Sequence, residues 1–185
     1  MTRCQGVLAV GVILMTHASA AVQAADREYD PVPSPEAVVV SGQARFTVLT
    51  PTLIRLEWSP AARFEDRASL AFVNRKLPVP VFSRVSVDGW LVLSTDAMTL
   101  RYREGSGKFA EDNLKIDVRV GRMETRWTPA SRPVGNLLGT TRTLDGVSGA
   151  TDIEPGILSR DGWTLVDDSR RVLFDNGDWP WAVAR

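Results

Sequence analysis

Cysteine and histidine are scarce in this sequence, which has one of each, Cys4 and His17, both within residues 1–20. Because this segment has the layout of a secretory signal peptide, we expect the mature chain to contain neither residue. A chain without them forms no disulfide, no Cys/His zinc site, no thiolate nucleophile and no histidine-based triad. We therefore predict no metal site and no cofactor. Any chemistry would come from carboxylates, arginines, hydroxyls or the backbone.

The signal peptide is predicted from three features of the N-terminus. Arg3 supplies a positive charge, residues 7–15 form an unbroken apolar run, and small residues follow up to Ala20 or Ala25. The apolar run is too short to cross a bilayer, which takes about 20 residues. We expect export to the periplasm or the extracellular space. Cleavage is expected after Ala20, or as late as Ala25, with no membrane span afterwards.

Excess charge of either sign is also lacking, because 22 basic residues face 22 acidic ones. No tract of lysines and arginines stands out along the chain, so the electrostatic footprint of a nucleic-acid-binding protein is absent. The sequence therefore predicts no nucleic-acid partner.

A helical period is the third thing that the sequence lacks, since no segment of ten or more residues repeats its apolar positions every 3.6 residues. Apolar and polar residues alternate instead in residues 53–58 and 114–120, which is typical of half-buried strands. Residues 44–49 form another expected strand, paired with 53–58. These patterns predict an all-β protein, an antiparallel β-sandwich.

Turn signals separate the expected strands. Asp88-Gly89, Asp161-Gly162 and Asn176-Gly177 are pairs that tolerate positive φ and suit two-residue hairpins. A further turn is expected at residues 104–108, around two glycines. Residues 63–72 are the one place where we expect a helical turn.

A proline-rich linker is expected between the signal peptide and the sandwich. Residues 21–37 contain Pro31, Pro33 and Pro35, and proline at this density favours an extended backbone. The alternative is that the segment packs along the domain as an edge. The predicted organisation is a signal peptide at 1–20, a linker at 21–37 and a sandwich domain at 38–185.

Acidic pairs and tryptophans are the side chains to consider for chemistry. Asp167 and Asp168 would point to opposite faces of a strand, so we do not expect them to act together. Residues 175–178 are interpreted as a turn, because no glutamate follows to complete a calcium loop. Of the six tryptophans, Trp58 and Trp90 lie in strand patterns and are expected in the core. Trp163 follows a turn and is a candidate sugar-stacking platform, with a core position as the alternative.

Two segments are more specific than these patterns. Residues 136–146 read NLLGTTRTLDG and residues 154–163 read EPGILSRDGW. Together they resemble the N-terminal domain of glycoside hydrolase family 31, which includes α-glucosidases and α-xylosidases. Residues 45–58 are similar to the opening hairpin of that domain, and residues 127–129 to the segment ahead of the first motif. The similarity covers residues 38–185.

The resemblance implies a sandwich of galactose-mutarotase-like type, followed by a (β/α)₈ barrel that carries the family's catalytic aspartates. Such a barrel takes about 250 residues, and no residue of this chain matches the catalytic motifs. We therefore expect no catalytic residue here and no activity of the chain alone. The chain would be the non-catalytic N-terminal domain of an exported retaining α-glycosidase, truncated before the barrel. Its expected partners are a barrel in cis or in trans and an α-linked glucan, xyloside or related oligosaccharide.

The resemblance also implies a small substrate-binding role. In the family, a loop of the N-terminal domain reaches the mouth of the barrel, and Arg160-Asp161 resembles the Arg-Asp of that loop. Asp161 would accept hydrogen bonds from sugar hydroxyls, Arg160 would orient it or donate to an oxygen, and Trp163 would pack beside them. The alternative is a plain hairpin turn with a surface Arg–Asp contact. At the level of the whole chain, the alternatives are a stand-alone carbohydrate-binding module and a structural or docking domain.

Overall fold

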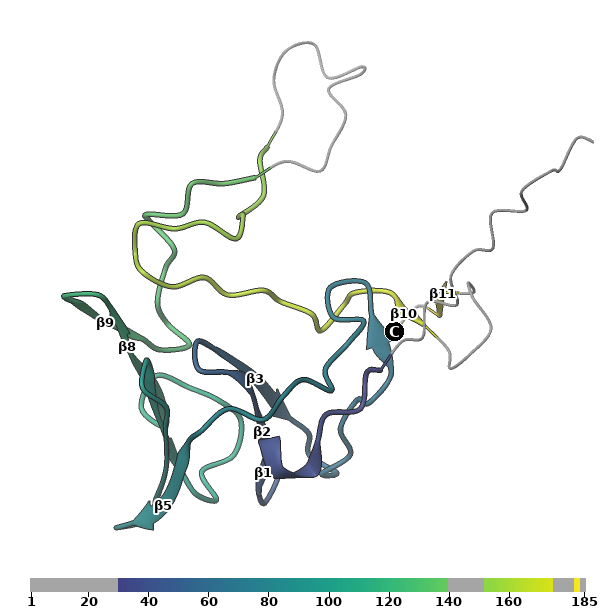
Figure 1. Cartoon of the computed structure of the whole chain (residues 1–185), viewed down its shortest axis with the longest axis vertical. Helices are drawn as coiled ribbons and strands as arrows, with labels where there is room; N and C mark the ends of the chain where they lie inside the picture. The colour runs from purple at the N-terminus through teal and green to yellow at the C-terminus, as the bar shows by residue number, and fades with distance from the viewer. Residues whose placement is uncertain (1–29, 140–151, 175–181, 184–185) are drawn as a thin grey trace, which may run out of the picture.

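A computed structural model of the chain describes residues 30–139, 152–174 and 182–183 (Figure 1). The predicted signal peptide and the predicted turn at Asn176-Gly177 lie outside these residues. The regular elements within them are η1 Pro35–Ala37, β1 Val38–Ser41, β2 Ala44–Thr50, β3 Leu53–Trp58, β4 Ala68–Ser69, β5 Ser83–Val87, β6 Trp90–Ser94, β7 Met98–Arg103, β8 Leu114–Val120, β9 Met123–Trp127, β10 Leu173–Phe174 and β11 Ala182–Val183.

The first sheet has the order β1-β2-β3 and is antiparallel throughout. The predicted hairpin of β2 and β3 is confirmed, with Phe46 opposite Leu56 and a shift of register between Val48 and Thr50. Alternation along β3 places Leu56 and Trp58 toward the core, while Arg55 and Glu57 point to the other side.

The second sheet is a five-stranded meander in the order β5-β6-β7-β8-β9. The predicted turn between β5 and β6 is confirmed, because Asp88 and Gly89 have φ values of 51° and 76°. Both residues thus adopt the left-handed conformation that a type I′ hairpin requires. The glycine-rich turn after β7 is confirmed as well, with Gly105 and Gly107 also at positive φ.

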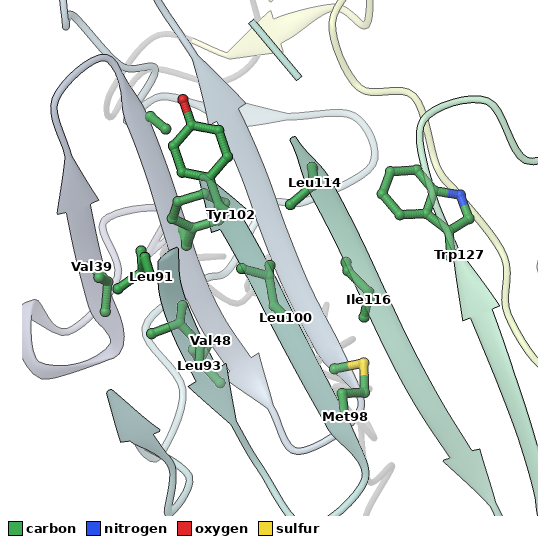
Figure 2. Packing of buried hydrophobic residues seen from close by; sticks show 12 residues of the cluster. Val39, Val48, Leu91, Leu93, Met98, Leu100, Tyr102, Leu114, Ile116 and Trp127 are labelled. Carbon is green, nitrogen blue, oxygen red and sulfur yellow. The ribbon is translucent and has the colours of Figure 1, made fainter. Parts of the chain in front are cut away.

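The main core lies between these two sheets. Phe46 and Val48 of β2 meet Leu91 and Leu93 of β6 and Leu100 of β7, and all five side chains are almost fully buried. Figure 2 labels four of these side chains, Val48, Leu91, Leu93 and Leu100, and shows Trp127 at the far end of the cluster. The protein is therefore an all-β, antiparallel sandwich, as its sequence predicts.

A small third sheet joins distant parts of the chain, because β4 and β11 both pair with β10. The helical turn expected at residues 63–72 is wrong, since this segment contains β4 instead. Leu173 pairs with Ser69 across more than one hundred residues of sequence, so a non-local partner decides the conformation.

Residues 30–37, the described end of the predicted linker, lie against the sandwich. The carbonyl of Asp30 accepts a hydrogen bond from Arg75 N at 2.7 Å, and that of Pro31 accepts one from Arg75 Nε. Pro31 and Pro33 are buried, and η1 leads directly into β1. This stretch packs along the domain as an edge segment.

Candidate functional site

Two segments extend together from the sandwich after β9 and return before β10 (Figure 1). We call residues 132–139 and 152–166 the arm, and they contain the described parts of both sequence motifs. Backbone hydrogen bonds join the segments from Gly139 N to Glu154 O, from Leu137 N to Leu158 O and from Arg160 N to Gly135 O, at 2.8 to 3.0 Å. The arm thus consists of two irregular segments joined by backbone hydrogen bonds, with one isolated β-bridge between Asn136 and Ser159.

The side chain of Asn136 clamps the two segments at their centre. Its Oδ1 accepts hydrogen bonds from the backbone N–H groups of Leu138 and Gly156, both at 2.8 Å, and its Nδ2 donates to Gly156 O at 2.9 Å. Gly156 is required here because a Cβ would lie 2.5 Å from the carbonyl oxygen of Leu138. The two motifs are therefore bonded directly to each other through Asn136 and Gly156.

Asp161 closes the base of the arm. Its Oδ2 accepts hydrogen bonds from Gly135 N at 2.9 Å and from Ser159 Oγ at 3.2 Å. A Cβ on Gly135 would lie 2.5 Å from Asp161 Oδ1, so the backbone and the carboxylate are in close contact. In this structure the Asp161 carboxylate holds the loop in place, and one of its oxygens is already engaged.

The three predicted substrate-binding residues are consecutive or nearly so, but their side chains occupy different environments. Arg160 is exposed, Asp161 is half-buried inside the arm, and Trp163 is half-buried against the core. The rings of Trp163 and Trp127 meet edge to face, with centroids 6.5 Å apart. The core alternative for Trp163 therefore describes its position, and Arg160 is the one of the three that faces solvent.

The hairpin expected around Asp161-Gly162 is wrong, although the turn itself is present. Gly162 has a φ of 78°, but no strands flank it. Ser159 forms an isolated bridge with Asn136 instead. A Cβ on Gly162 would lie 2.5 Å from Met123 Cε, so this turn packs on the β8–β9 hairpin rather than closing one of its own.

Many large apolar side chains of the arm are exposed. Ile157 is 77% and Leu158 64% exposed, and Val134, Leu137, Leu138, Ile153 and Leu165 are also largely accessible. Apolar side chains exposed together on one segment are suited to contact another macromolecular surface.

Sequence reasoning missed a cluster of ionic groups, largely buried except for Asp66, on the outer side of the β2–β3 hairpin. The Arg45 guanidinium donates to Glu57 at 2.8 Å and to Asp66 at 2.7 Å, and Arg55 donates to Asp168 at 3.0 Å. We call these five residues the arginine cluster. Asp168 is thus ion-paired, while Asp167 bonds to Ser169. Residues 167 and 168 lie outside the strands, and their two carboxylates have separate partners.

The electrostatics of the cluster follow from its burial. Burial acts to raise the pKa of Glu57, but the hydrogen bond from Arg45 and the charge of Arg55 outweigh it, so the pKa lies below its ordinary value. Beside the cluster, Arg75 donates to the carbonyls of Glu65 and Arg67. Burial, with the nearby charge of Arg55, lowers the pKa of Arg75 to about 10. These groups tie loops to the sheet and form a structural unit.

A second polar feature lies on the outer face of the five-stranded sheet. Trp90, expected in the core, is half-buried on this face, because its neighbour Leu91 takes the inward position. Lys115 Nζ lies 5.0 Å from the centre of the Trp90 ring. On β8 and its neighbours, Asp117 binds both Arg101 and Arg126 across the strands, beside an open cleft of about 430 Å³.

Comparison with known proteins adds no relative, since no family model and no curated protein matches the chain. Within residues 30–139, 152–174 and 182–183, no three acidic, histidine or cysteine side chains are grouped as a metal site would require. The same residues contain no helix with the length and apolar character of a membrane span.

Replacing Asn136 with alanine is expected to loosen the arm without unfolding the sandwich. The variant loses three hydrogen bonds worth about 1 kcal/mol each, so amide exchange in residues 136–139 and 154–160 should accelerate about 100-fold. Hydrogen exchange read by mass spectrometry measures this. Thr164→Val is the matched control, because it removes only one bond to the same Gly156 carbonyl. Equal exchange in both variants would contradict the clamp.

Proposed function

We propose that this chain is the non-catalytic β-sandwich domain of an exported retaining α-glycosidase of the family 31 type. The arm supports this proposal most directly. Its two segments are the motifs that resemble the family, and Asn136 and Asp161 hold them in one defined conformation. A braced extension with exposed apolar side chains is suited to pack against a second domain.

In this proposal the arm contributes to the rim of a sugar site formed by a (β/α)₈ barrel. Arg160, exposed beside the Asp161-Gly162 turn, donates hydrogen bonds to a sugar oxygen. Asp161 acts as a positioning residue, because its carboxylate already binds Gly135 and Ser159. Trp163 anchors the turn on Trp127 and borders the site. The substrates of the complete enzyme in this proposal are α-linked glucans, xylosides or related oligosaccharides.

In this proposal the isolated chain is inactive, and the pairing of two of its least exposed carboxylates with arginines supports that expectation. Retaining hydrolysis uses two carboxyl groups about 5 Å apart around the glycosidic bond. The buried carboxylates Glu57 and Asp168 are instead ion-paired with Arg45 and Arg55. We assign bond cleavage to the partner barrel.

The test is reconstitution with the catalytic partner. The DNA after the Arg185 codon, or a neighbouring gene, is expected to encode a (β/α)₈ barrel. Expressed together, the two parts should hydrolyse 4-nitrophenyl α-glucoside or α-xyloside, and this chain alone should hydrolyse neither. Arg160→Ala should raise KM about tenfold with little change in kcat, as expected for one charge-assisted hydrogen bond.

Arg132→Ala is the control for that experiment, because Arg132 is also exposed at the base of the arm. It should leave both kinetic constants unchanged. Hydrolysis by the isolated chain, unrelated neighbouring genes, or an Arg160→Ala enzyme with normal KM would each contradict the proposal.

A further inference from the structure

The cleft on the outer face of the five-stranded sheet is separate from the arm and has no role in the proposed function. It lies over β7, β8 and β9 and the turn that precedes β7. Its volume of about 430 Å³ falls within the range of small-molecule sites. Side chains of Arg101, Asp117 and Arg126 come from three neighbouring strands and point to this face, since the residues between them face the core.

Two hydrogen bonds to one carboxylate orient the polar groups of the cleft. Asp117 Oδ2 accepts from Arg101 Nη1 at 2.5 Å, and Asp117 Oδ1 accepts from Arg126 Nε at 2.6 Å. Each guanidinium uses one nitrogen in this contact. In the part of the chain that the structure describes, their other nitrogens form no hydrogen bond. The cleft therefore presents pre-oriented donors beside a shared acceptor.

The charges that line the cleft cancel. Three cations, Arg101, Arg119 and Arg126, face three anions, Asp96, Asp117 and Glu124. Such a surface offers no net attraction to a phosphate or a metal ion. It offers donors and acceptors side by side, which suits hydroxyl groups, since each hydroxyl both donates and accepts.

An apolar platform borders the same face. Trp90 and Val92 point outward from β6, and Val92 is paired with Arg101 in the neighbouring strand. Trp90 lies two residues before Val92 in β6, opposite Arg103 and outside the cleft lining, with Lys115 Nζ 5.0 Å from the centre of its ring. A ring with polar edges and apolar C–H faces would meet hydrogen-bonding groups in the cleft and the apolar side chain of Val92 next to Arg101.

We infer that this cleft is a binding site for a neutral saccharide, with Arg101, Asp117 and Arg126 bonding its hydroxyls. The site is distinct from the arm and does not depend on a catalytic partner. Bidentate contact from an arginine and an aspartate to neighbouring hydroxyls would orient the sugar ring. The exposure of these groups limits affinity, so the expected dissociation constant is on the order of 1 mM.

Amide NMR of the isolated chain, titrated with maltotriose, cellobiose, xylobiose and inorganic phosphate, tests the inference. At least one saccharide should shift the amide signals of Thr99, Arg101, Asp117 and Arg126, and phosphate should not. Asp117→Asn and Arg126→Gln should each weaken binding at least tenfold. Arg103→Ala, an outward residue of β7 beyond the cleft lining, should leave it unchanged.

Each other outcome overturns the inference. Shifts with phosphate alone would indicate an anion site, and shifts confined to Arg160, Asp161 and Trp163 would place sugar binding on the arm. No shift with any saccharide, or full binding by both cleft variants, would remove the site. Because no barrel is present, failure here leaves the proposed function untouched, and failure to reconstitute hydrolysis leaves this site untouched.

Discussion

Replacing Glu57 with glutamine is expected to lower the free energy of unfolding by about 3–5 kcal/mol, the usual cost of breaking a buried ion pair. The Glu57 carboxylate accepts two hydrogen bonds from Arg45, at 2.8 and 3.0 Å, and lies 3.3 Å from Arg55 Nε. The side chains of both arginines are about nine-tenths buried. A neutral amide of the same shape leaves them without their shared counter-charge.

Urea unfolding followed by tryptophan fluorescence measures this loss. Glu124→Gln is the control, because Glu124 is 79% exposed and lies 3.6 Å from Arg119. Surface pairs of this kind contribute less than about 1 kcal/mol. A Glu57→Gln protein as stable as the control would show that the arginine cluster tolerates loss of its central charge.

The stabilities of wild type and Glu57→Gln should become more similar in acid. In the folded state the pKa of Glu57 lies below its ordinary value of 4.5, so its ionisation stabilises the fold above that pH. This contribution is lost as the pH falls through the lowered pKa of the folded state, where wild-type Glu57 becomes neutral as well. The difference between wild type and Glu57→Gln is therefore expected to shrink through this range. A constant difference would assign the loss to the hydrogen bonding of the amide rather than to the missing charge.

The arginine cluster also shows where sequence reasoning ends. Alternation along residues 53–58 correctly assigned Arg55 and Glu57 to the face opposite the core. The polar face of an alternating strand is usually expected to be exposed to water. Here Asp168 accepts a hydrogen bond from Arg55, and the backbone N–H of Glu65 donates to Glu57, both from loops that a local pattern does not place in space.

Strands and tight turns were predictable because their signals are local. The period of two in β3 and β8 and the positive φ at Asp88-Gly89 depend only on neighbouring residues. The same kind of local signal led to a wrong prediction at Asp161-Gly162, where a hairpin was expected. That pair permits a turn, but whether its flanks pair with each other depends on competing partners. Gly135 and Asn136 take the backbone bonds on one side, and Trp127 takes Trp163 on the other.

The candidate site was predictable in part for the same reason. The motifs pointed to residues 136–163 as a unit, and Asn136 does bind Gly156 within it. The different exposures and contacts of Arg160, Asp161 and Trp163 depend on the path of the arm, which the motifs do not specify. The outer-face cleft had no sequence signal, because Arg101, Asp117 and Arg126 belong to three strands and meet only through their register.

The largest packing loss is expected at the aromatic centre of the core. The ring of Phe46, from β2, lies 5.3 Å from that of Tyr102 on β7 and 5.7 Å from that of Phe109 in the loop that follows. Phe46 is fully buried, and Tyr102 reaches past it to donate to Gly107 O at 2.7 Å. The three rings therefore join the two sheets and the loop between β7 and β8.

Phe46→Ala is expected to cost about 3–5 kcal/mol, because the cavity would lie between two sheets that meet through this ring. Tyr102→Phe should cost only about 1 kcal/mol, since it keeps the ring and loses one hydrogen bond. Val85→Ala, on the exposed edge strand β5, should change stability by less than about 0.5 kcal/mol. Thermal and urea unfolding of the three variants give the ranking. If Phe46→Ala were no worse than Tyr102→Phe, the aromatic trio would not be what holds the two sheets together.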